Sequence, residues 1–175
     1  PRGPAFCVSG RAGAGSAMPP DISIRPLRDC PAAIDPLAAA FEREWPDWYR
    51  PGGQGDAAAD LAAYANPDGT LPVGVVALDA IGAPLGTAAL KAAFTPAFTH
   101  LTPWASAGWV TPSLRRHGLG ALLLRALEAE ARRLGFAHIY CATSTAITLL
   151  QREGWTPHAQ TVHDGHEIRI FQRAL

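Results

Sequence analysis

Residues 109–121, WVTPSLRRHGLGA, combine residue types and spacing suited to binding a phosphate group. A strand-like run leads into Gly118 and Gly120, and an amphipathic helical pattern follows them. The first turn of a helix has unpaired N–H groups and a partial positive charge, and glycine lets the backbone approach a bulky anion. Arg115 and Arg116 add positive charge. The stretch predicts a phosphate site; the alternative is a glycine turn that only packs a helix on a sheet.

The glycine spacing excludes two familiar nucleotide-binding loops. A Walker loop requires GxxxxGK[ST], and a dinucleotide fold requires GxGxxG. Neither pattern occurs at 109–121. The predicted phosphate therefore belongs to a ligand that neither of these two loops binds.

The elements that must position this loop follow from hydrophobic periodicity and from turn residues. We expect strands over 22–27, 71–78, 85–93, 104–111 and 136–142, and a final hairpin around the Asp164-Gly165 turn. We expect helices over 36–45, 57–64, 119–134 and 146–153. Asp35 and Asp56 are the predicted N-caps of the first two helices. On the helix over 119–134 we expect Arg125, Glu128 and Arg132 to form a solvated ladder of charges.

The composition indicates which partners and which cellular compartment are expected. The chain has 175 residues, with 15 Lys+Arg against 15 Asp+Glu and no block of like charges, so no nucleic-acid or membrane-surface partner is expected. No apolar run approaches the length that spans a bilayer. The three cysteines form no CxxC or zinc pattern, which favours a reduced, cytoplasmic protein with no metal site. We interpret residues 1–17 as a flexible extension or added sequence, and 18–175 as one domain.

Three segments together resemble the GNAT superfamily of acyl-CoA N-acyltransferases. Arg115-x-x-Gly118-x-Gly120 is similar to its pyrophosphate loop, [Q/R]-x-x-G-x-[G/A]. Residues 143–155, TSTAITLLQREGW, resemble the later N-x-x-A-x-x-L-Y-x-x-x-G-[F/W] segment, and 72–91 resemble the second and third strands. The resemblance spans about residues 21–173, and the segments WPDWYRPGG and HDGHEIRIF are similar to one bacterial branch of the family.

This resemblance implies a fold and a co-substrate. The fold is a single α/β GNAT-like domain, a mixed central sheet of about six or seven strands flanked by about four helices. The co-substrate is acetyl-CoA, held in a cleft where the strand over 104–111 splays from the strand over 137–142. Its pantetheine and pyrophosphate would be bound at Trp109, Val110, Arg115, Arg116, His117, Gly118, Leu119 and Gly120.

The sequence departs from the family at the two positions where many members have their general acid and general base. Many members have a Tyr general acid at the position of Leu150 and a Glu general base at the position of Trp104. The catalytic residues are therefore unknown from the sequence. His163 and His166 flank the predicted hairpin turn and are weak candidates, because imidazole titrates in a useful range; the alternative is a pair of exposed hairpin histidines.

An acidic and aromatic segment is the candidate acceptor site. The family resemblance places it on the substrate side of the cleft, and acids beside aromatic rings suit a protonated amine. Its residues are Glu44, Trp45, Asp47, Trp48 and Tyr49. The alternative is that the aromatic residues belong to the core and that the carboxylates form a solvated face.

The sequence thus predicts an acetyl-CoA-dependent N-acetyltransferase that acts on a small primary amine. Two alternatives remain open. One is a non-catalytic acyl-CoA-binding regulator, which the missing Tyr and Glu would suit. The other is a protein N-terminal or lysine acetyltransferase, which would need an open groove for a peptide. The sequence is also compatible with a homodimer.

Overall fold

The computed structural model describes residues 21–163 and 165–175, so the expected extension over 1–17 lies outside the described residues. The strands are β1 (Ser23–Pro26), β2 (Val73–Leu78), β3 (Pro84–Lys91), β4 (Trp104–Val110), β5 (His138–Thr143), β6 (Thr156–His163) and β7 (His166–Ala174). The helices are α1 (Ile34–Glu44), α2 (Pro46–Tyr49), α3 (Ala57–Tyr64), α4 (Leu119–Arg133) and α5 (Ile147–Arg152). Within this part of the chain, the predicted order of elements is confirmed except for the short helix α2.

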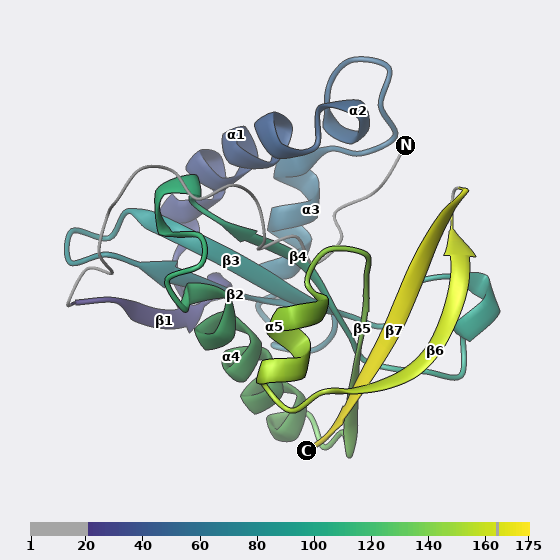
Figure 1. Cartoon of the computed structure of the whole chain (residues 1–175). Coiled ribbons are helices and arrows are strands. Elements are labelled where there is room, and N and C mark those ends of the chain that lie inside the picture. The colour runs from purple at the N-terminus through teal and green to yellow at the C-terminus, as the bar shows by residue number, and fades with distance from the viewer. Residues whose placement is uncertain (1–20, 164) are drawn as a thin grey trace.

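The seven strands form one twisted mixed sheet (Figure 1). Their order is β1-β2-β3-β4-β5-β7-β6. Neighbouring strands are antiparallel except β4 and β5, which are parallel. The single parallel pair lies at the centre, and α4 forms the crossover between its strands. The α/β class and the mixed sheet are confirmed.

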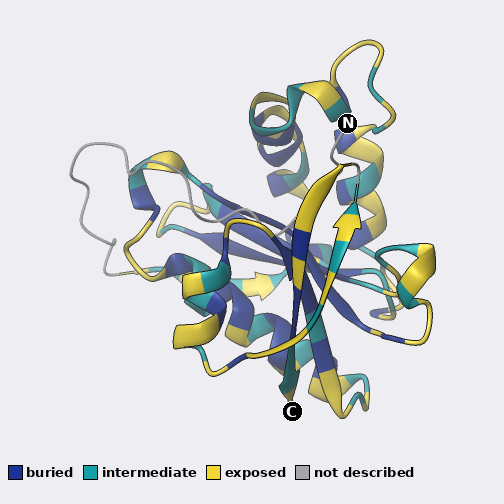
Figure 2. Ribbon diagram, turned by 45° about the vertical axis from the view of Figure 1, so that its right-hand side comes forward, coloured by how far each residue is buried: buried dark blue, intermediate teal, exposed yellow. Residues whose placement is uncertain are grey.

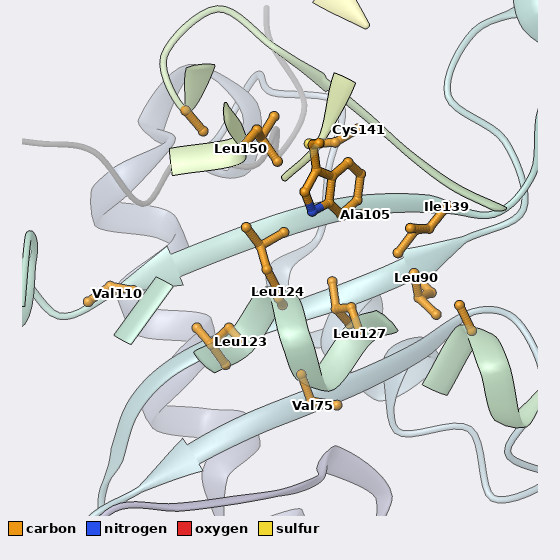
Figure 3. Close-up of a cluster of buried hydrophobic side chains, with 14 of the residues drawn as sticks. Val75, Leu90, Ala105, Val110, Leu123, Leu124, Leu127, Ile139, Cys141 and Leu150 are labelled. Carbon is orange, nitrogen blue, oxygen red and sulfur yellow. The ribbon is translucent and has the colours of Figure 1, made fainter. Parts of the chain in front are cut away.

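One face of the sheet packs against α4 and α5 through aliphatic side chains (Figure 3). Leu123, Leu124 and Leu127 of α4 are fully buried and lie against Val75 and Leu90 of the sheet. Their spacing places them on one side of a helix, as the sequence pattern predicts. This contact fixes the start of α4, and with it the glycine loop, relative to β4.

The opposite face is covered by two separate groups of side chains. Leu37 and Phe41 of α1 and Leu61 of α3 pack over the first half of the sheet. Over the second half, Trp104 and Ile170 pack with partly buried rings from the segment that joins β3 to β4. Buried residues lie on the two faces of the sheet and on the helix sides that pack against them. Exposed residues lie mainly on loops and outer helix surfaces (Figure 2).

Local capping explains where the first helices begin. Asp56 is confirmed as the N-cap of α3, because its Oδ1 accepts a hydrogen bond of 2.9 Å from the N–H of Ala59. The prediction that Asp35 caps α1 is wrong: the cap is Ala33, the last residue of a 3₁₀ turn at Pro31–Ala33, and Asp35 lies in the first helical turn. The carboxylate there still favours the helix dipole. The one-turn helix α2 was not predicted, because a loop was expected there.

The polar face of α4 also differs from expectation. The Glu128 side chain is 5% exposed and accepts a hydrogen bond of 3.0 Å from Trp155 Nε1. Arg173 lies 3.1 Å from the same carboxylate. Glu128 therefore ties α4 to the C-terminal half of the sheet, whereas the predicted ladder placed it in solvent.

Candidate active site

The parallel strands β4 and β5 separate after two register pairs. Trp104 pairs with Tyr140 and Ala105 with Cys141, and both strands continue beyond these pairs without hydrogen-bonding each other. A bulge in β4 accompanies the separation: Ala107 has φ +52°, and the register with β3 shifts there. A bulge bends its strand and increases the local twist. The result is a V-shaped divergence of the two strands within the sheet, called the opening below.

Backbone groups of β4 face this opening. The N–H of Thr111 donates to the Leu85 carbonyl, 2.8 Å away, and so points toward β3. Because successive residues of a strand direct their N–H groups to opposite sides, the amide of Val110 points toward β5. An extended ligand in the opening can pair with β4 as a missing strand would.

The glycine loop closes the wide end of the opening and leads into α4. Arg116 and Gly118 both have left-handed backbone, with φ +68° and +95°. Gly118 is the N-cap of α4, so the N–H groups of Leu119 and Gly120 belong to the first turn and have no helical partner. Among the described residues, no backbone carbonyl accepts from the N–H of Arg116 or Gly118 either. Converging unpaired N–H groups form an anion-binding nest.

Two of the predicted phosphate donors are used inside the loop. The N–H of Arg115 donates to the Pro112 carbonyl at 3.4 Å, and the N–H of His117 donates to the Leu114 carbonyl at 3.3 Å. The His117 ring also folds back, with Nδ1 2.9 Å from the Arg115 carbonyl. Both residues shape the loop, and the donors left for a ligand come from the four other residues of 115–120.

A pocket of about 610 Å³ adjoins the unpaired N–H groups. It lies between the start of α4 and α5, and it is lined by Arg116, Gly118, Gly120, Ala121, Thr145, Ala146, Thr148, Leu149, Arg152 and Glu153. Arg116 and Arg152 form no ion pair with a described carboxylate, whereas Glu153 is paired with Arg125 at 2.8 Å. The pocket therefore has a positive edge beside a nest of amides, which suits a ligand with several phosphates.

The Arg115 side chain has a different role from the one predicted for its charge. It is only 8% exposed, and its Nε donates to the Val110 carbonyl at 3.0 Å. Its Nη2 lies 2.5 Å from Glu44 Oε2, at the end of α1. The guanidinium charge is thus neutralised by a carboxylate instead of facing the pocket.

The candidate acceptor residues separate into core and surface. Tyr49 is buried, its hydroxyl donates to Asp60 Oδ2 at 2.7 Å, and burial raises its pKa. Trp45 packs edge-on against Phe41, with ring centroids 4.9 Å apart. Trp48 is also partly buried in this cluster, and its Nε1 is buried without an acceptor among the described residues. Asp47 alone of the predicted carboxylates is both exposed and free of an ion pair within the described chain.

The two positions usual for proton transfer in the family are closed by packing. Trp104 is fully buried, and its Nε1 donates to the Leu101 carbonyl at 2.7 Å. Leu150 is fully buried in the core beneath α5. His163 packs its ring 5.1 Å from Phe94, which in turn contacts Trp104. His163 therefore lies beside the aromatic cluster around Trp104, while His166 is exposed on the other strand of the hairpin.

The role of Lys91 was not predicted from the sequence. Lys91 ends β3 opposite Trp104, and its Nζ lies 5.3 Å from the centroid of the Tyr64 ring. Burial lowers the pKa of Lys91, while the charge of Asp60 opposes that shift. The available signal was its residue type, because Lys91 is the one lysine beside fourteen arginines.

A known family matches about two thirds of the chain. The model of the acetyltransferase (GNAT) family matches residues 37–154, which include β2 to α5 and the glycine loop. The chain belongs to the GNAT family. The prediction of an acyltransferase is confirmed by this membership. No curated protein matches the chain.

Solved structures of GNAT proteins share the fold. An aminoglycoside 6′-N-acetyltransferase complexed with coenzyme A is 16% identical, with a TM-score of 0.70 over 87% of this chain and 96% of that one. The protein yncA from Salmonella typhimurium, determined with its cofactor acetyl-CoA, is 24% identical with a TM-score of 0.64, over 87% and 93%. A GCN5-related N-acetyltransferase from Kribbella flavida is 23% identical with a TM-score of 0.64, over 88% and 98%.

The described residues were also searched for metal-binding groups and for membrane-spanning helices. They contain no group of three or more His, Cys, Asp or Glu side chains arranged to hold a metal ion. Within the same residues, no helix is long and apolar enough to cross a membrane.

Proposed function

We propose that this GNAT protein transfers an acetyl group from acetyl-CoA to a small primary amine. The observation that carries the proposal is the opening between β4 and β5, which ends at a loop with unpaired N–H groups. An extended amide-containing arm fits the opening, and a pyrophosphate fits the loop. The two relatives determined with coenzyme A or acetyl-CoA support this assignment, because they have the same fold.

Each part of acetyl-CoA has a proposed partner in the chain. The pyrophosphate accepts from the N–H groups of Gly118, Leu119 and Gly120, with Arg116 and Arg152 at the edge of the pocket. The pantetheine arm pairs with the N–H of Val110, whereas the backbone groups of Trp109 face β3. The thioester then lies near the bulge in β4, where the N–H of Val110, which points away from β3, polarises its carbonyl oxygen.

The proposed chemistry is direct attack by the neutral amine. The nitrogen forms a bond to the thioester carbon, the C–S bond breaks, and the thiolate of coenzyme A leaves with the electron pair. The amine proton passes to solvent, and solvent protonates the thiolate. Holding acetyl-CoA on β4 beside a bound amine supplies the orientation that the reaction needs.

The deprotonation step has the larger cost. An alkylamine has a pKa near 10.4, so only about one molecule in 2,500 is neutral at pH 7, a handicap of about 4–5 kcal/mol. A thiol with a pKa near 8.5 leaves with less help. We therefore propose that amine deprotonation limits the rate.

A second candidate function is a non-catalytic acyl-CoA-binding regulator. The buried, apolar side chains of Leu150 and Trp104 favour it, because they leave no acid or base at the usual positions. A screen for thiol release from acetyl-CoA over alkylamines, aminoglycosides and peptides separates the candidates. Thiol release with a small amine supports the proposed enzyme. Release with peptides alone supports a protein acetyltransferase, and tight binding without release supports the regulator.

A further inference from the structure

A buried ion pair joins the phosphate loop to the helix on the acceptor side. Arg115 begins the loop motif, and Glu44 is the last residue of α1, 71 positions earlier in the chain. Their side chains are 8% and 21% exposed, and the Nη2 to Oε2 distance is 2.5 Å. A contact between segments so far apart in sequence is a tertiary link that local structure does not require.

The same guanidinium also fixes the end of β4. Its Nε donates to the Val110 carbonyl, so one planar group bonds the strand and the helix at once. Arginine suits this position because its donors have a rigid relative geometry. The end of β4, the loop and the end of α1 are therefore held to a single side chain.

Glu44 in turn leads directly into the acceptor segment. Trp45, the next residue, ends α1 with its N–H bonded to the Phe41 carbonyl at 2.8 Å, and Pro46 begins α2. Any displacement of Glu44 moves the junction that carries Trp45 and Asp47. The pair thus links the loop proposed for acetyl-CoA to the segment proposed for the amine.

We propose that Arg115 and Glu44 are positioning residues that couple acetyl-CoA binding at the loop to the conformation of the α1–α2 junction. This inference rests on the proposed function, because it assumes that acetyl-CoA binds the loop. Ordering the loop fixes Arg115, and Arg115 fixes Glu44 and the junction. By thermodynamic linkage, a junction held in place also strengthens acetyl-CoA binding.

Hydrogen–deuterium exchange tests the coupling in the full chain. Exchange of peptides covering 41–50 is measured with and without saturating acetyl-CoA, together with acetyl-CoA affinity by calorimetry. In the unsubstituted protein and in the control Glu42→Gln, which changes an exposed carboxylate of the same helix, acetyl-CoA slows exchange over 41–50 as well as over 111–121. In Glu44→Gln the slowing is confined to 111–121, and the affinity falls about fivefold or more.

The outcomes separate this inference from the proposed function. If acetyl-CoA does not bind the unsubstituted protein, the proposed function fails. If it binds and protects 111–121 but exchange over 41–50 does not change, the coupling alone is overturned. Equal protection of 41–50 in Glu44→Gln also overturns it. If Glu44→Gln does not fold, Arg115→Gln serves as the second variant, because it keeps a side-chain donor near Val110 and loses the charge.

Discussion

Trp104 packs against Tyr140, with ring centroids 5.7 Å apart, at the place where β4 and β5 begin to separate. Trp104 is fully buried and also contacts Phe94 and Phe98. These rings close the narrow end of the opening in the sheet. An aromatic cluster thus occupies the place where many GNAT members have a catalytic carboxylate, and proton transfer must follow another route.

Restoring the usual general acid should not accelerate this protein. Leu150 is fully buried among Leu124, Cys141 and other core residues, so Leu150→Tyr adds a larger side chain to a filled core. We expect a loss of stability of about 1–3 kcal/mol in denaturant unfolding and a rate of thiol release that does not rise. A tenfold faster rate in the folded variant would show that the phenol reaches the thiolate.

The pH dependence of the rate reports the source of the base. If solvent removes the amine proton, kcat/KM rises through about pH 8 to 9, with no inflection near 6.5, the ordinary histidine value. The profiles of His163→Ala and His166→Ala should have the same shape as that of the unsubstituted protein. An inflection near 6.5 that disappears in either variant would identify a histidine base instead.

Lys91 should lower stability at neutral pH. Because burial lowers its pKa, the unfolded chain binds more protons between the folded value and the ordinary value of 10.5. The cost of the buried charge is therefore present in full below this window and disappears as the pH rises through it.

The matching variant is Lys91→Met, which keeps the apolar stem but removes the charge. It also loses the contact with the Tyr64 ring, worth about 0.5–1 kcal/mol. We expect Lys91→Met to raise the Tm at pH 7, by about 2–4 °C for each kcal/mol gained, and the gain to shrink as the pH approaches 10. A lower Tm at pH 7, measured by calorimetry, would show that the ring contact outweighs the burial cost.

Asp47 is the remaining candidate for amine recognition. It is exposed on α2, and Glu44 is already paired with Arg115. An exposed carboxylate contributes about 0.2–1 kcal/mol, so Asp47→Asn should raise KM for the amine by about 1.5- to 5-fold and leave acetyl-CoA affinity unchanged. Steady-state kinetics and calorimetry check the two parts. An unaltered KM would place the acceptor site elsewhere.

The sequence was sufficient to predict the elements whose signals are local. The apolar spacing on α4, the cap at Asp56 and the glycines of the loop each depend on residues within one turn or two. These features gave the order of the strands and helices and the position of the loop. They failed at α1, where a 3₁₀ turn after Cys30 places the N-cap at Ala33, two residues before the Asp35 that local rules favour.

Tertiary contacts were beyond that reasoning. Nothing near Glu44 in the sequence indicates that it meets Arg115, and nothing near Glu128 indicates that Trp155 and Arg173 bury it. A charged residue on a helix is usually solvated, and only the fold shows which one has a buried partner. The loop therefore lies between a strand and a helix as the sequence predicts, its binding of a phosphate stays a prediction, and the contacts of individual side chains required the structure.

The most direct test of the central claim is calorimetric titration of acetyl-CoA into Gly120→Glu. Gly120 lines the pocket in the first turn of α4, where a carboxylate would repel the proposed pyrophosphate. We predict that the unsubstituted protein binds acetyl-CoA and that Gly120→Glu does not, while Gly120→Ala, a small and uncharged control, retains most of the affinity. Unchanged acetyl-CoA affinity in folded Gly120→Glu would contradict the assignment of the loop.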